Sequence, residues 1–118
     1  MLPYFEPNGP GPFDPNALVT ACIEAGAPAL LADVGALSPA FFDLSSGVAG
    51  DVLRRLTLYG VAMAAVVSDL SKHSASFQAF AVEANRGTAF RSFGTRAEAV
   101  LWLEERVART SDPWGRTR

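Results

Sequence analysis

The sequence is poor in the residues that mark several classes of protein. It has one cysteine among 118 residues, so it cannot form an internal disulfide, and we expect a reducing, cytoplasmic setting. Its 12 acidic and 10 basic residues nearly balance, which argues against a nucleic-acid-binding surface. No apolar run approaches the ~20 residues that a membrane span needs, and the first residues lack the pattern of a signal peptide. These absences predict a protein that neither enters a membrane nor binds nucleic acid.

The chain does have enough apolar sequence for a folded core. Apolar residues make up 49% of it and charged residues 19%, a composition that is too apolar for a disordered protein. A length of 118 residues falls within the usual range for one domain. We therefore expect a single domain over residues 1–110, followed by a tail at 111–118 that has no periodic pattern and frays.

Short apolar runs alternate with amphipathic segments along the chain. Two of the runs predict buried strands, at residues 29–34 and 61–67, and a further strand is predicted at residues 88–93. A fourth strand is predicted at residues 2–6, at an edge of the sheet, because Pro3 has no N–H to donate. The amphipathic segments predict four helices, which begin after Asp14-Pro15, after Ser45 or Ser46, near Phe77 and after Thr95. Since strand and helix alternate with short connections, the expected fold is α/β, with a four-stranded, mainly parallel sheet and four helices.

The junction at residues 38–50 holds the most specific local pattern. Ser45, Ser46 and Gly47 stand where a loop enters an amphipathic helix, so hydroxyl groups and backbone N–H groups meet the positive end of the helix dipole. Such an arrangement caps a helix or receives an anion. Because sites in parallel sheets lie beyond the carboxyl ends of the strands, we expect Asp33, the junction and residues 68–74 to share one edge.

The same stretch carries a family resemblance. From Phe41 to Asp51 the chain reads Phe-Phe-Asp-Leu-Ser-Ser-Gly-Val-Ala-Gly-Asp, and together with Ser71-Lys72 and residues 83–87 it resembles a bacterial family catalogued as domain of unknown function 4180. The likeness covers residues 13–104 and implies no activity. A more distant resemblance is to the STAS (anti-sigma-factor antagonist) domain, in which Asp-Ser-Ser-Gly leads into a helix. It implies a STAS-like architecture and Ser46 as a phosphoacceptor, although Leu44 is an extra residue here.

Each of these features also has a purely structural interpretation. Ser45 and Ser46 can be simple helix caps, and Phe41 and Phe42 can pack one ring in the core and one over its neighbours. Asp43 is expected to bond the local backbone. His73 is the only histidine, and without a nucleophile elbow it does not make a convincing catalytic triad. One histidine and one cysteine on separate elements also predict no metal site, and nothing in the sequence calls for a cofactor.

We therefore expect a small cytoplasmic regulatory or protein-interaction module of STAS-like type, in which Ser46 can act as a switch. The alternative is a small-ligand-binding protein or an enzyme that uses the same edge. The sequence does not decide whether the protein is an enzyme, but it favours a protein without catalytic activity. An unidentified protein is the expected partner, and self-association is left open. The nine residues expected to form this surface, here called the carboxyl-edge surface, are Phe41, Phe42, Asp43, Ser45, Ser46, Gly47, Ser68, Asp69 and His73.

Overall fold

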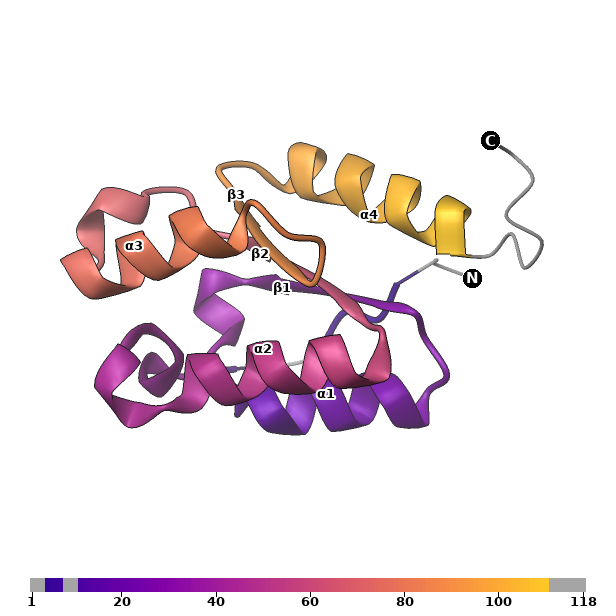
Figure 1. The fold of residues 1–118 in the computed structure, drawn as a ribbon, viewed down its shortest axis with the longest axis horizontal. Coiled ribbons are helices and arrows are strands. Elements are labelled where there is room, and N and C mark those ends of the chain that lie inside the picture. The colour runs from indigo at the N-terminus through magenta and orange to yellow at the C-terminus, as the bar shows by residue number, and fades with distance from the viewer. Residues whose placement is uncertain (1–3, 8–10, 111–118) are drawn as a thin grey trace.

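The computed structural model describes residues 4–7 and 11–110, which form a single α/β domain (Figure 1). Three parallel strands make up its sheet, in the order β1 (Ala29–Asp33), β2 (Ala62–Val66) and β3 (Phe90–Phe93). The segments at residues 29–34, 61–67 and 88–93 thus form the predicted parallel strands. The tail predicted to fray, at residues 111–118, lies outside the described residues, as do residues 1–3.

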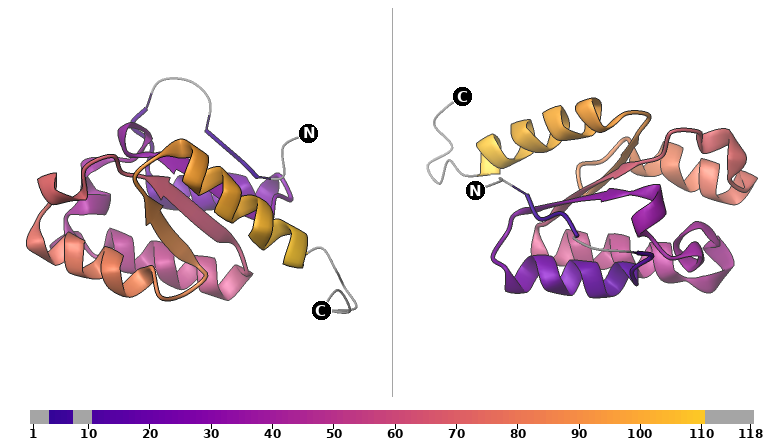
Figure 2. Two further views of the ribbon diagram at one scale, coloured as in Figure 1. Left: turned by 90° about the horizontal axis from the view of Figure 1, so that it is seen from above. Right: turned by 180° about the vertical axis from the view of Figure 1, so that it is seen from behind.

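Helices cover both faces of this sheet. Figures 1 and 2 show α1 (Pro15–Glu24) and α2 (Val48–Tyr59) on one side of it and α4 (Arg96–Thr110) on the other. Helix α3 (Ala75–Ala84) joins the side of α1 and α2, because its buried residues belong to the same apolar cluster. The four predicted helices are therefore confirmed.

Alternate residues of each strand point into two separate cores. Leu30 of β1 and Met63 of β2 belong to the core beneath α1, α2 and α3, whereas Leu31 and Ala64 belong to the core beneath α4. All four are 0% exposed. Since both faces of the sheet are covered, the strands need no polar alternation, and this explains the apolar sequences of β2 and of β1 up to Asp33.

The prediction of a four-stranded sheet is wrong. Of the described residues 4–7, only Phe5 pairs with the edge strand β1: its N–H donates to Ala29 O and its carbonyl accepts from Leu31 N, both at 2.8 Å. In a parallel ladder the next donor would be the N–H of residue 7, and Pro7 has none. Within the described part of the chain, residues 4–7 therefore add an isolated bridge and no fourth strand.

Local caps define the helix ends as the sequence predicts. The Asp14 carboxylate accepts from Asn16 N, with Pro15 at the first helical position of α1. Helix α2 ends at Gly60, whose φ of 68° is in the left-handed region that glycine adopts without strain. Of the helices within residues 4–7 and 11–110, none has the length and apolar character needed to cross a membrane.

Candidate functional site

The structure brings together the two loops predicted to share the carboxyl edge of the sheet. Phe42 ends a 3₁₀ turn (Pro39–Phe42) before α2, and His73 follows another (Leu70–Lys72) after β2. Their rings stack with centroids 4.5 Å apart and planes 20° from parallel. Phe42 also lies edge-on to Phe77 of α3, with centroids 5.0 Å apart. This contact joins the loop before α2 to the loop before α3.

The adjacent phenylalanines have different environments. Phe41 is 0% exposed and packs against Phe77 and Phe90, whereas Phe42 is only partly buried and packs over Phe41 at a centroid distance of 5.3 Å. One ring therefore fills the core and the other covers it, as the packing interpretation predicts. Of the pair, only Phe42 presents ring surface to the solvent at this edge.

Ser46 stands one residue before Gly47, which is the N-cap of α2, so neither Ser45 nor Ser46 is the predicted N-cap. The Ser46 Oγ accepts from Val48 N (3.2 Å) and lies 2.7 Å from the carbonyl oxygens of Ala40 and Asp43, to which the hydroxyl can donate. Gly47, with φ of 80°, makes the turn into the helix. The hydroxyl therefore has a structural role in the junction, while the residue stays exposed.

The other polar residues of the carboxyl-edge surface make local bonds. Asp43 accepts from the N–H (3.1 Å) and hydroxyl (2.6 Å) of Ser45, so Ser45 stabilises the turn instead of capping α2. Asp69 accepts from Ser71 N at 3.1 Å in the same kind of turn, and Ser68 beside it is exposed. Among the described residues, no group of three or more His, Cys, Asp and Glu side chains could hold a metal ion.

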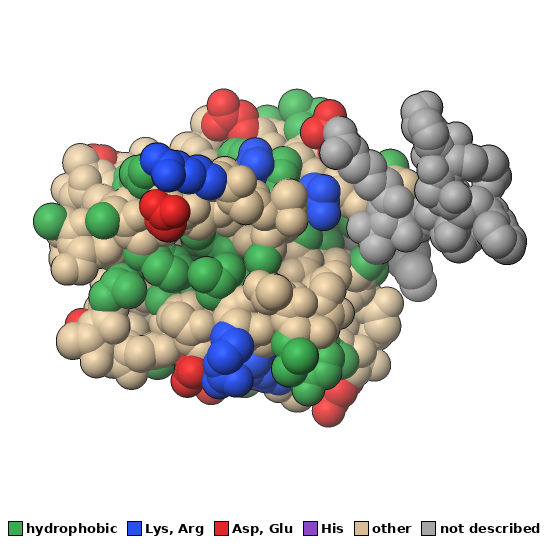
Figure 3. Space-filling model, viewed as in Figure 1, with side chains coloured by type: hydrophobic (Ala, Val, Ile, Leu, Met, Phe, Trp, Pro, Cys, Tyr) green, Lys and Arg blue, Asp and Glu red, His purple; other side chains and the backbone are tan. Residues whose placement is uncertain are grey.

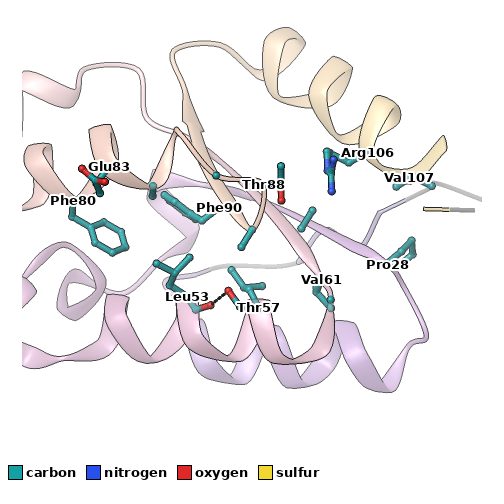
Figure 4. Close-up of a pocket in the computed structure, with 16 residues that line it drawn as sticks. Pro28, Leu53, Thr57, Val61, Phe80, Glu83, Thr88, Phe90, Arg106 and Val107 are labelled. Carbon is teal, nitrogen blue, oxygen red and sulfur yellow. Dashed lines mark hydrogen bonds between the residues drawn. The ribbon is translucent and has the colours of Figure 1, made fainter. Parts of the chain in front are cut away.

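A well-formed cavity lies at the opposite edge, where sequence analysis predicted no site. This cavity, of about 470 Å³, opens between the C-terminal halves of α2 and α3 and extends to the end of α4 (Figure 4). Pro28, Val61 and Thr88, which come shortly before the three strands, line it, so it lies at the amino ends of the sheet. Figure 3 shows apolar side chains gathered in a hollow across this face, with Lys and Arg side chains on both sides.

Apolar side chains form most of the wall of this cavity, and a few polar groups stand at its margins. Phe80 points into the space from α3, and Leu53 faces it from α2 (Figure 4). The Thr57 hydroxyl donates to Leu53 O at 2.9 Å, so it is satisfied within its own helix. Glu83 and Arg106 stand toward opposite ends of the cavity in the same view. The arrangement is that of a pocket for a mainly apolar molecule with a polar end.

Small residues leave the space that forms the cavity. Ala84, at the end of α3, and Gly87, Thr88 and Ala89, in the connection to β3, all line it. These four small residues, with Asn85 and Arg86 between the first and the second, are the signal that the sequence offers. This signal is weak, because small residues in a helix-to-strand connection are also expected for close packing.

Comparison with known proteins identifies the family. The sequence profile described as Domain of unknown function (DUF4180) matches residues 13–103, a span that includes the junction and nearly all of the cavity wall. No curated protein and no solved structure matches the chain. The match covers most of the 118 residues, and the chain therefore belongs to the DUF4180 family.

Proposed function

We propose that this protein binds a small, mainly apolar molecule in the cavity between α2, α3 and α4. The observation that carries the proposal is the cavity itself, of about 470 Å³ and with a mostly apolar lining. Binding pockets for small molecules occupy about 300–1,000 Å³ and combine apolar walls with a few polar groups. Burying apolar ligand surface there would contribute about 25 cal/mol per Å².

In the alternative that the sequence left open, a small ligand would bind at the carboxyl edge of the sheet. The cavity proposed here as the binding site lies at the amino edge instead. At the carboxyl edge the polar groups of Asp43, Ser45 and Ser46 already bond to one another or to the nearby backbone. A ligand there would have to compete with those bonds. At the amino edge an apolar ligand would replace water beside apolar side chains, which is favourable.

The test is thermal unfolding of the purified protein with decanol, decanoic acid and decylamine, each kept below the concentration at which it forms micelles. A molecule that binds the folded state raises the melting temperature by mass action. The matched variants are Thr57→Trp, which places a large ring at an exposed position of the cavity wall, and Leu58→Trp, next to it on α2 but 69% exposed and outside the cavity. We expect stabilisation of wild type and Leu58→Trp and its loss in Thr57→Trp. No stabilisation of wild type by any of the three compounds would refute the proposal.

A second candidate function is the cytoplasmic regulatory module of STAS-like type, which would bind another protein through the carboxyl-edge surface. The observation that favours it is the Phe42–His73 stack, since this half-buried aromatic contact joins two loops beside Ser46. Phosphorylation of Ser46 would add a charge of about −1.5 to −2 to this surface. It would also replace the hydroxyl that bonds Ala40 O or Asp43 O.

Capture of partners from a native lysate tests this second candidate. Wild type would be compared with Phe42→Ala and with Ser46→Asp, and Leu101→Ala, a change at an exposed position of α4, would serve as the control. We expect wild type and Leu101→Ala to capture the same partners. At least one of Phe42→Ala and Ser46→Asp is expected to lose some of them. Identical partner sets for all four proteins, together with an intact mass that carries no phosphate in protein from the native host, would contradict it.

A further inference from the structure

The cavity has a cationic side chain at one end. Arg106 comes from the last part of α4 and lines the cavity beside Val107. Figure 4 shows its nitrogen atoms directed away from α4, toward the side of the cavity where Val61 lies. The residue is partly buried, so its charge is less screened by water than that of a fully exposed arginine.

The acidic residue of the cavity lies in a different setting. Glu83 is on the rim formed by α3, and its carboxylate pairs at 3.8 Å with Arg86 in the turn that follows this helix. The two side chains are 76% and 75% exposed, so water solvates this pair from most sides. Glu83 is therefore a weaker anchor for a charged ligand group than a partly buried side chain, because its charge is well solvated.

We propose that the cavity binds a monocarboxylic acid with an elongated apolar body, whose carboxylate bonds Arg106 and whose body lies along Phe80 and Leu53. This inference rests on the proposed function and adds the chemical class of the ligand. A guanidinium has N–H donors in a planar fork that matches a carboxylate, which favours an acid over an alcohol at this end. The Thr88 hydroxyl, which lines the same cavity, is a further polar group for the head of the ligand.

The volume sets the size of the apolar body. A water molecule takes about 30 Å³ of liquid, and a methylene group is close to it in size, so 470 Å³ holds about 15 such groups. An unbranched acid of about ten carbons fits with room for the adjustment of side chains. Arg106 favours a negatively charged head group, and the apolar walls favour a hydrocarbon chain. Both features therefore favour a medium-chain carboxylic acid.

The decisive measurement is the ratio of the dissociation constants of decanol and decanoic acid, by isothermal titration at neutral pH. We expect wild type to bind the acid about tenfold more tightly, as one charge-assisted hydrogen-bonded contact predicts. In Arg106→Met, which keeps the length of the stem without the charge, the ratio is expected to fall to about one. Arg106→Lys keeps the charge but not the fork, and an intermediate ratio is expected.

The control for loss of positive charge is Arg54→Met. Arg54 is exposed on α2, pairs with Asp51 at 3.1 Å and does not line the cavity, so the wild-type ratio is expected to persist. Circular dichroism melts of each variant show whether a change in the ratio comes from unfolding. Equal binding of decanol and decanoic acid by wild type would overturn the assignment of the ligand class while the proposed function stands, and so would a preference for decylamine. Absence of binding by all three compounds would overturn both.

Discussion

Replacement of Phe41 by alanine tests the central role of this ring in the core. The side chain is 0% exposed, and its ring centroid lies 5.3–5.8 Å from those of Phe42, Phe77 and Phe90. Truncation removes buried apolar surface, leaves a cavity and loses three aromatic contacts. A cost of about 4 kcal/mol in the free energy of unfolding is expected, within the range for Phe→Ala in a core. A domain of this size has a total of about 5–15 kcal/mol.

Phe42→Ala is the matched control, because Phe42 is adjacent in sequence but only partly buried. Its loss removes the stack on His73 and the edge contact to Phe77, and a smaller cost of about 1.5 kcal/mol is expected. The assay is urea unfolding followed by far-ultraviolet circular dichroism, with equal slopes required for a valid comparison. With an unfolding entropy of about 250 cal/mol/K for 118 residues, Phe41→Ala should also lower Tm by about 16 °C. A cost for Phe41→Ala no larger than for Phe42→Ala would refute this account of the core.

Three further predictions follow from side-chain contacts. Ser46→Ala loses both the bond from Val48 N and the bond to Ala40 O or Asp43 O and should cost about 1 kcal/mol in urea unfolding, whereas Ser46→Asp keeps the acceptor at the helix N-terminus but cannot donate and should recover only part of that cost. The guanidinium of Arg96 beside Glu6 lowers the pKa of that carboxyl below its ordinary 4.5, so the pair stabilises the fold above this pH and the stabilisation is lost as pH falls through the lowered native pKa. Glu6→Gln should therefore flatten the acid side of the profile of Tm against pH. Burial raises the pKa of the Cys22 thiol to about 11, so iodoacetamide at pH 8 should label it only as the protein unfolds, by mass spectrometry.

Each of these predictions has an outcome that contradicts it. Equal stability of Ser46→Ala and wild type would mean that the Val48 N–H is satisfied equally well by water. An acid limb of the same steepness in Glu6→Gln would mean that the ion pair with Arg96 does not form in solution. Rapid labelling of Cys22 in native buffer, at a rate independent of added urea, would mean that the thiol is accessible in the folded state.

Local patterns in the sequence were sufficient for the elements of this fold. Runs of apolar residues predicted β1 and β2 because a strand covered on both faces needs no polar positions. Asp14 with Pro15 and the left-handed Gly60 predicted the limits of two helices, because capping bonds involve residues only a few positions apart. The edge that unites Phe42 and His73 was predictable from the rule that loops after parallel strands meet at the carboxyl ends.

Tertiary structure decided the features that depend on pairs of distant segments. Whether the N-terminal segment forms a strand depended on the one N–H that Pro7 lacks opposite β1, and this requires the register of the pairing. The cavity is the space left at the amino ends of the strands beside α2, α3 and the end of α4, and its wall joins residues as far apart as Pro28 and Val107. A cavity depends on how far packed helices stand apart, and no periodic pattern in a single segment records that distance.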